Sequence, residues 1–186
     1  MREELEIKLG NDFPFMKRTN TNDGNIYQKW GCECADGWYQ LLRDLCQEIT
    51  NIYSNAGMPI DIIVEQVKEK FATLRFYYSF EGTPCPIQAF DCLSDGTGIR
   101  FQPRNESDNE DKKKLRKDIA QTVRKYEEKS KFVCECCGNE GTIRMELPWK
   151  RTLCDQCLSE HLQKIEHRKA EQKRQIQKLK DKLKEK

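Results

Sequence analysis

Hydrophobic residues recur at steps of three and four along residues 38–53, which predicts an amphipathic α-helix. Asp36 is a suitable N-cap, and Asn55, Ala56 and Gly57 supply a stop signal. We expect the wide apolar face of this helix to be buried. The face consists of Trp38, Leu41, Leu42, Leu45, Ile49, Ile52 and Tyr53. Residues 1–35 show little regular pattern.

Two later stretches are typical of β-strands. Residues 60–67 follow Pro59 and are rich in β-branched side chains, and residues 73–80 alternate apolar and other positions. Residues 87–92 and 98–102 predict a second hairpin. The apolar positions on one side of the 73–80 strand are Leu74, Phe76, Tyr78 and Phe80. We therefore expect one long helix packed on a small antiparallel sheet.

A polar, acidic stretch at residues 103–111 is the expected internal boundary. A basic helix is expected over residues 112–131, with a narrow apolar stripe. The stripe consists of Leu115, Ile119, Val123 and Tyr126. This pattern predicts an N-terminal α+β domain over residues 1–111. The second part, residues 112–186, would hold the basic helix, a zinc finger over residues 132–160 and a long charged helix.

The C-terminal segment has positions spaced 4-3-4-3-4-3-4, which form the seam of a heptad pattern. These positions are Leu158, Leu162, Ile165, Lys169, Gln172, Ile176, Leu179 and Leu183. Lys169 and Gln172 interrupt the apolar seam at its centre. Three interpretations stay open: a solvated charged helix, a coiled coil with itself or another protein through residues 158–183, and docking on nucleic acid.

Two C-x-x-C pairs near the C-terminus are the strongest chemical signal. Cys134 with Cys137 and Cys154 with Cys157 are separated by sixteen residues and can supply the four sulfurs of a tetrahedral Zn²⁺ site. A knuckle, a hairpin and a ligand-bearing helix in this order predict a treble-clef-like zinc finger. Cys136 is an alternative ligand, although Cys137 gives the two-residue spacer and precedes a glycine. A second metal site is conceivable at Cys32, Cys34, Cys85 and Cys92.

The sequence offers little for catalysis. Four cysteines close the coordination shell, so the predicted zinc is structural and leaves no open position for a substrate. Phosphate-binding glycine loops and helix-borne zinc protease motifs are absent. His161 and His167 lie on the charged C-terminal helix, where we expect them to be solvated. Glu65 with Glu69 is a weak candidate for a Mg²⁺ nuclease site, as is Asp91 with Asp95. No catalytic residue is predicted.

The net charge of +2 hides a division between the two halves of the chain. Residues 1–111 hold 11 Lys and Arg against 19 Asp and Glu, whereas residues 112–186 hold 22 against 12. This asymmetry favours a polyanionic partner for the basic half, or pairing between the halves. The candidate residues for nucleic-acid or partner binding are Lys112, Lys113, Lys114, Arg116, Lys117, Arg144, Lys150 and Arg151.

Several motifs together resemble a family of small uncharacterised proteins encoded by bacteria and their phages. They are the Asp36-Gly37-Trp38 helix start, the stretch QVKEKFATLRFYY at residues 66–78, and the finger motifs CxxCG and LCxxC. The resemblance covers about residues 30–157. It implies the architecture above and no established activity. The segment at residues 83–111 and the basic tail depart from the family's pattern.

These observations lead to a functional hypothesis. We expect a non-enzymatic zinc-binding interaction protein, a phage or mobile-element accessory or inhibitory factor for a protein complex acting on nucleic acid, such as a CRISPR effector nuclease. The alternatives are direct binding of DNA or RNA and, third, a metal-dependent nuclease. The N-terminal residues lack an apolar signal and no apolar run is long enough for a bilayer, so we expect cytoplasmic localisation in a bacterial host and no membrane partner.

Overall fold

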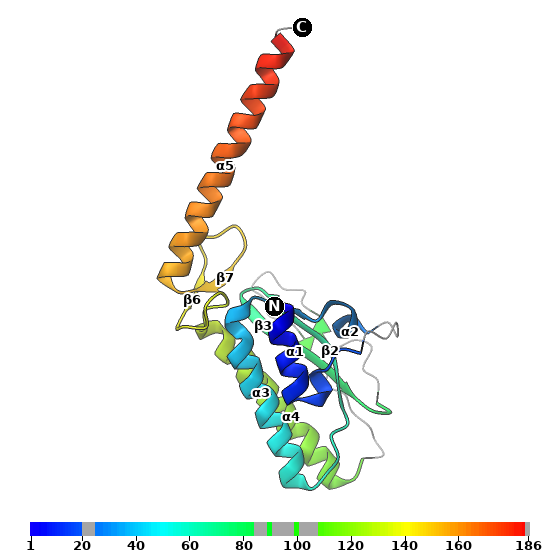
Figure 1. The fold of residues 1–186 in the computed structure, drawn as a ribbon. Helices are drawn as coiled ribbons and strands as arrows, with labels where there is room; N and C mark the ends of the chain where they lie inside the picture. Colours follow the sequence, from blue (N-terminus) through cyan, green and yellow to red (C-terminus); the bar gives the residue numbers. More distant parts are fainter. Residues whose placement is uncertain (20–24, 84–88, 91–98, 101–107, 185–186) are drawn as a thin grey trace.

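The computed structural model of the chain describes residues 1–19, 25–83, 89–90, 99–100 and 108–184 and has the predicted α+β class (Figure 1). Short 3₁₀ turns occupy Pro14–Met16, Asp36–Trp38 and Ser130–Phe132. The described helices are α1 (Glu3–Asp12), α2 (Ile26–Trp30), α3 (Tyr39–Ala56), α4 (Glu110–Lys129) and α5 (Asp155–Lys184). The described strands are β1 (Cys32–Glu33), β2 (Ile62–Lys70), β3 (Thr73–Phe80), β4 (Ala89–Phe90), β5 (Ile99–Arg100), β6 (Thr142–Arg144) and β7 (Arg151–Leu153).

The main sheet is mixed, so the prediction of an antiparallel sheet was wrong in part. Strands β2 and β3 are antiparallel, with Ile62 opposite Phe80, as the alternating pattern predicts. Strand β1 adds to the other edge of β2 in parallel, with Cys32 opposite Val67. A strand of two residues is too short to show an alternating pattern. Strand β2 also begins two residues later than predicted and runs on to Lys70.

Helix α3 follows the predicted pattern, and its apolar face lies in the core. The prediction of Asp36 as N-cap was wrong, because its carboxylate instead accepts hydrogen bonds from the backbone N–H and the guanidinium of Arg2. The helix ends at Gly57, whose left-handed conformation lets its N–H reach the carbonyl of Ser54.

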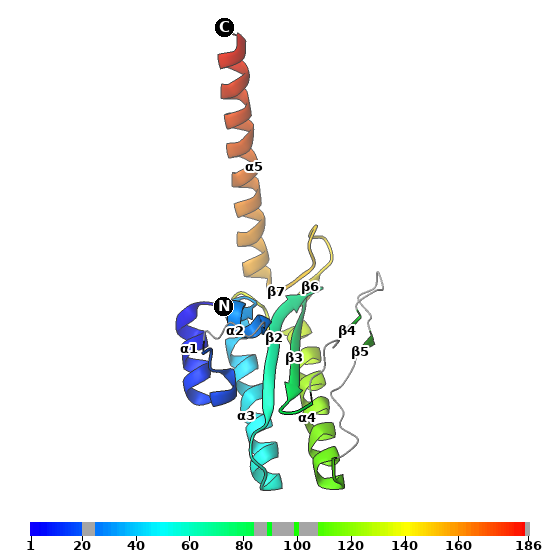
Figure 2. The same ribbon diagram turned by 90° about the vertical axis from the view of Figure 1, so that its right-hand side faces the viewer.

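The core lies between the sheet and the pair of helices α3 and α4. Both helices lie behind the sheet in the view of Figure 2, side by side along its length. The α4 stripe at Leu115, Ile119, Val123 and Tyr126 joins the same buried cluster as α3 and β3. This core therefore includes residues on both sides of the predicted boundary at residue 111.

Helix α4 and the 3₁₀ turn that follows it accept hydrogen bonds from two backbone N–H groups at the outer edge of β3. The N–H of Leu74 donates to the hydroxyl of Ser130 at 2.8 Å, and the N–H of Phe76 donates to a carboxylate oxygen of Glu127 at 3.0 Å. These backbone groups would otherwise be unpaired edge donors in the interior. The contacts fix the end of α4, and hence the start of the cysteine-bearing segment, relative to the sheet.

We expect Ser130→Ala to lower the free energy of unfolding by about 1–3 kcal/mol, because the buried N–H of Leu74 loses its acceptor. Equilibrium urea unfolding of the metal-loaded protein measures this change. Ser54→Ala, at an exposed position near the end of α3, is the control and should stay within about 0.5 kcal/mol of the wild type. Equally small effects for both substitutions would show that the hydrogen bond between Leu74 and Ser130 does not stabilise the fold.

The sequence predicted the β4–β5 hairpin and the C-terminal helix but not the two N-terminal helices. Ala89 pairs with Arg100 and Phe90 with Ile99, in agreement with the predicted hairpin, of which the other residues lie outside the described ones. Residues 103–107 of the predicted boundary also lie outside them. Helices α1 and α2 were not predicted. Helix α5 begins at Asp155 and projects away from the rest of the molecule (Figures 1 and 2).

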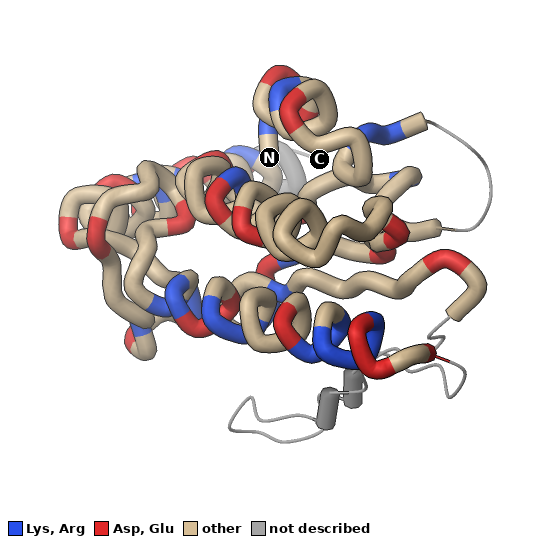
Figure 3. Tube along the Cα trace, turned by 90° about the horizontal axis from the view of Figure 1, so that it is seen from below, with Lys and Arg blue, Asp and Glu red and all other residues tan. Residues whose placement is uncertain are grey.

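Basic and acidic residues are interspersed along α4, which lies along the lower side in Figure 3. Lys125 Nζ lies 2.9 Å from a carboxylate oxygen of Glu48 on α3. Arg116 pairs with Asp108 at 2.6 Å and lies 3.8 Å from Asp61. Part of the charge division between the two halves is thus matched by pairs within one molecule.

Candidate metal centre

The structure brings the four predicted cysteines together in one cluster. The sulfur atoms of Cys134, Cys137, Cys154 and Cys157 all lie within 4.8 Å of one another, and those of Cys137 and Cys154 are 3.7 Å apart. Four sulfurs at about 2.3 Å from one tetrahedral ion are about 3.8 Å apart from each other. The cluster therefore has the size and the donor set of a tetrathiolate metal site.

The first pair of cysteines lies on a tight backbone turn. The N–H of Gly138 donates to the carbonyl of Cys134 at 2.8 Å, and the N–H of Cys134 donates to the carbonyl of Asn139 at 2.7 Å. Gly138 has a φ of +81°, a conformation that glycine adopts without strain. The turn places Cys134 in the interior and Cys137 on the exposed side.

The second pair spans the junction of β7 and α5. Cys154 directly precedes α5, and Cys157 lies in its first turn, where the backbone N–H groups have no partners within the helix. The N–H of Cys157 approaches the sulfur of Cys154 at 3.4 Å. Arg144 on β6 donates to the carbonyl of Leu153 and contacts Asp155 at 2.5 Å, which ties the hairpin to the start of α5.

The protein environment favours a thiolate at Cys134. Burial disfavours its ionised form, but backbone N–H groups of Cys154, Cys137 and Cys136 directed at its sulfur outweigh burial and lower the pKa of Cys134 to about 7. Burial and then the neighbouring thiols raise the pKa of Cys157. Several thiolates this close repel one another unless a cation neutralises them. The cluster can therefore hold a soft divalent metal ion, and among the described residues no fifth His, Cys, Asp or Glu donor joins it.

The cysteine turn packs directly on the start of α3. The N–H of Gly37 donates to the carbonyl of Glu135 at 2.8 Å, and the indole N–H of Trp38 donates to the carbonyl of Val133 at 2.8 Å. A Cβ on Gly37 would lie 2.3 Å from the carbonyl oxygen of Cys134. Gly37 and Trp38 are thus structural parts of the centre. The sequence pattern placed Trp38 on the apolar face of the predicted helix and did not connect either residue with the cysteines.

A second contact joins the β6–β7 hairpin to the sheet. The hydroxyl of Thr152 is buried and donates to the carbonyl of Ala72 in the β2–β3 turn at 2.7 Å. The indole of Trp149 donates to a carboxylate oxygen of Glu69 at 3.2 Å. With the contact at Gly37, this places the cysteine cluster in a fixed position between the α+β core and α5.

Among the other described cysteines, none joins the cluster. Cys136 is exposed, and its sulfur accepts a contact of 3.6 Å from Arg151. Cys32 and Cys34 are buried, and burial is the main reason that their pKa values are raised. The other two members of the hypothetical second site, Cys85 and Cys92, lie outside the described residues.

The predicted basic residues do not form one surface. Lys112, Lys113, Lys114, Arg116 and Lys117 belong to the first turns of α4, at the end of the helix away from the cysteine cluster in Figure 1. Helix α4 spans about 30 Å, and these residues lie in its N-terminal half, away from the cysteine cluster.

The arginines of this set already have partners. Arg116 is 10% exposed and pairs with Asp108, Arg144 contacts Asp155, and Arg151 pairs with the buried Glu135. Lys113 contacts Glu110 at 2.8 Å. Lys150 is half-buried beside β7.

The described residues that were weighed for catalysis make hydrogen bonds or contacts within the fold. Glu65 accepts hydrogen bonds from Asn25 and Ser79, and Glu69 accepts one from the N–H of Ala72. The Nδ1 atom of His161 lies 3.4 Å from the guanidinium of Arg151. Asp91 and Asp95 lie outside the described residues. Among the described residues, the four cysteines form the one group of His, Cys, Asp and Glu side chains arranged to hold a metal.

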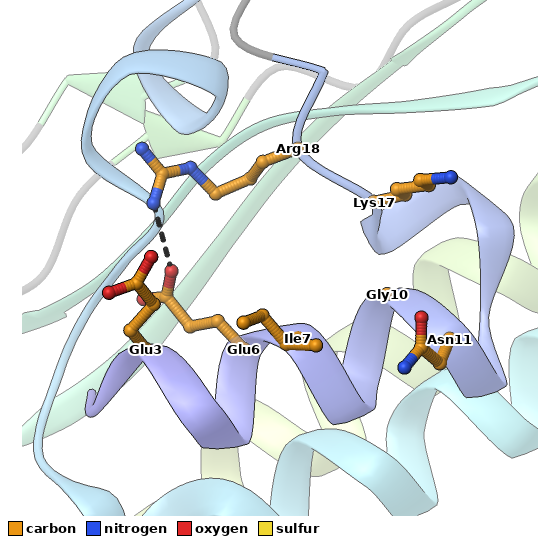
Figure 4. A pocket seen from close by; sticks show the side chains of 7 residues that line it. All are labelled: Glu3, Glu6, Ile7, Gly10, Asn11, Lys17 and Arg18. Atoms are coloured by element: carbon orange, nitrogen blue, oxygen red, sulfur yellow. Dashed lines mark hydrogen bonds and ion pairs between the residues drawn. The ribbon is translucent and has the colours of Figure 1, made fainter.

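A separate pocket lies between α1 and the segment that follows it (Figure 4). Glu6 is buried there, and its carboxylate accepts hydrogen bonds from Arg18 at 3.1 Å and from the N–H of Cys32 at 2.8 Å. The first bond joins α1 to the segment that follows it, and the second joins α1 to the start of β1. The pocket is lined by Glu3, Glu6, Ile7, Gly10, Asn11, Lys17 and Arg18. The charged pair of Glu6 and Arg18 in this pocket therefore has a structural role, which is to connect α1 with its neighbouring segments.

Comparisons of the chain with protein-family models, with curated proteins and with solved structures find no match. The resemblance to bacterial and phage proteins therefore stays a prediction. Each helix in the described residues is too short or too polar to cross a membrane. The cysteine cluster and its attachment to α5 are the observations from which a function can be argued.

Proposed function

We propose that the protein is a non-enzymatic interaction protein in which a structural zinc ion fixes α5 on the α+β core. The proposal is carried by one observation, the cluster of four cysteines at the junction of the core and a projecting helix. Zinc suits four thiolates in tetrahedral geometry, and such a closed site contributes folding free energy instead of catalysis. Iron is the other metal that four sulfurs favour, and it would colour the purified protein.

The arrangement of the segment also supports a treble-clef-like finger. A cysteine turn, the β6–β7 hairpin and the N-terminus of α5 follow in that order, and each end of the arrangement supplies two sulfurs. A finger of this kind gives α5 a defined direction. The helix is mostly exposed along the described part of its length and is therefore available to a macromolecular partner.

A protein partner fits these observations better than direct binding of nucleic acid. Three arginines of the predicted basic set have acidic partners within the chain, and the basic turns of α4 lie far from the finger. Non-specific nucleic-acid binding needs a continuous surface of unpaired cations. The narrower role of an accessory or inhibitory factor in phage biology depends on the resemblance alone and stays a hypothesis.

Affinity purification from native cells tests the role of α5. We expect the tagged full-length chain to retain a protein partner after nuclease treatment, and a chain shortened to residues 1–163, which keeps all four cysteines, to lose it. Equal zinc content in both proteins is the control for folding of the finger. A partner that the shortened chain still retains would contradict the proposal. Loss of all bound material after nuclease treatment would favour the nucleic-acid alternative.

A further inference from the structure

Helix α5 has an apolar seam that is largely uncovered. Leu158, at its base, packs on the small cluster of Cys134, Leu147 and Leu153. Beyond that point, Leu162 is 41% exposed, Ile176 53% and Leu179 62%. Water-exposed leucine and isoleucine at heptad positions are typical of a helix that pairs with another helix.

The seam reads the same in both directions along the chain. From Leu162 and from Leu179 inward, the seam holds a leucine, an isoleucine and a polar residue, with identical spacing. A second copy of α5 in reverse orientation would therefore place Leu162 opposite Leu179, and Ile165 opposite Ile176. Lys169 would lie opposite Gln172 in the central layer. This symmetry matches a two-fold axis at the centre of an antiparallel pair.

The charges beside the seam also favour the reverse orientation. Glu166 and Lys173 each follow a seam position, and in an antiparallel pair they would lie next to each other across the interface twice. A parallel pair would instead bring Arg168 close to Lys173 and Lys169 against its own copy. Both contacts are between like charges.

The shape of the molecule is compatible with this pairing. Helix α5 stands clear of the α+β core in both views (Figures 1 and 2). In a reversed pair the two cores lie at opposite ends of the helices and do not compete for space. The finger fixes the first turn of α5, so the nucleation cost of a free helix is already met.

We infer that two copies of the chain associate through an antiparallel coiled coil of α5 over residues 162–179, a length of about 26 Å. The polar layer of Lys169 and Gln172 sets the register, since any shift would bury these side chains against leucine or isoleucine. This inference does not depend on the identity of another partner.

Sedimentation velocity over a wide concentration series tests the association with the full-length, metal-loaded protein. We expect reversible dimerisation of the wild type. Glu166→Lys and Lys173→Glu should each weaken it about tenfold, because two attractive pairs become repulsive. An equimolar mixture of the two variants should restore dimerisation, since each lysine then meets a glutamate. Both positions are exposed, so the substitutions leave the fold intact, which zinc content and circular dichroism verify.

Three results would overturn the inference. The first is a wild type that stays monomeric at every concentration. The second is a stronger dimer for Lys173→Glu, which would indicate a parallel pair relieved of its contact with Arg168. The third is failure of the mixture to associate better than either variant. None of these results changes the metal content, so the proposed zinc-dependent fold would still stand.

Discussion

Cys134→Ser is expected to abolish stoichiometric zinc binding and to unfold the segment from the cysteine turn to the start of α5. Structural zinc sites contribute on the order of 10 kcal/mol at neutral pH, and here that free energy supports a segment whose own apolar cluster is small. Its buried cluster consists of Cys134, Leu147 and Leu153 alone among the described residues. Cys134 is the fully buried ligand and accepts the backbone N–H groups, so serine cannot replace it without loss. Elemental analysis and hydrogen exchange over residues 132–160 measure the two effects.

Cys136→Ser is the matched control, since it removes a thiol two positions away that is exposed and outside the cluster. We expect this variant to keep one zinc per chain and the exchange protection of the wild type. Equal zinc content in both variants would show that Cys134 is not a ligand. Zinc loss in the Cys136 variant would indicate that Cys136 is a ligand, as in the alternative given by the sequence. Removal of the metal with a chelator should reproduce the effect of Cys134→Ser in the wild-type chain.

The local features of this fold were predictable from the sequence because local physics determines them. The C-x-x-C spacing constrains two sulfurs within one turn, and the three- and four-residue steps of α3 place its apolar side chains on one face. The α4 stripe was found for the same reason, although the helix begins at Glu110 and not at residue 112. In each case one continuous segment contains the whole signal.

Long-range contacts escaped prediction because no single segment encodes them. Strand β1 exists only through its parallel pairing with β2, and α1 is tied to that strand by the buried carboxylate of Glu6. Arg116 was predicted to bind a partner, yet it pairs with Asp108, which precedes the predicted helix, and lies 3.8 Å from Asp61 of the N-terminal half. A count of charges does not show which of them are already paired in the fold.

The orientation of α5 depends on two separate attachments. The metal would connect the cysteine turn to the first turn of α5, whereas Gly37 and Thr152 connect the same region to the core. Loss of the first attachment unfolds the finger. Loss of the second would leave a metal-loaded finger free to move relative to the core. The two attachments can therefore be separated by experiment.

Gly37→Ala should disrupt the Gly37 part of the second attachment and leave the first attachment intact. Its new Cβ would lie 2.3 Å from the carbonyl oxygen of Cys134 and 2.6 Å from the N–H nitrogen of Gly138, so backbone must move against backbone. Overpacking of this kind, which no side-chain rotation relieves, is expected to lower the free energy of unfolding by about 3 kcal/mol or more. Urea unfolding measures the loss, and a red shift of tryptophan emission reports exposure of Trp38, which is fully buried in the wild type.

Gly57→Ala separates this clash from the ordinary cost of replacing a glycine. Gly57 has a φ of +63°, and a Cβ added there would meet no atom of the described residues within 4 Å, so alanine causes only backbone strain of about 1–2 kcal/mol. We expect Gly37→Ala to be clearly the more damaging of the two, while both variants keep one zinc per chain because all four cysteines remain. If Gly57→Ala proves equally destabilising, the contact between Gly37 and the cysteine turn does not hold the finger on the core. If Gly37→Ala loses its zinc, the two attachments are one cooperative unit.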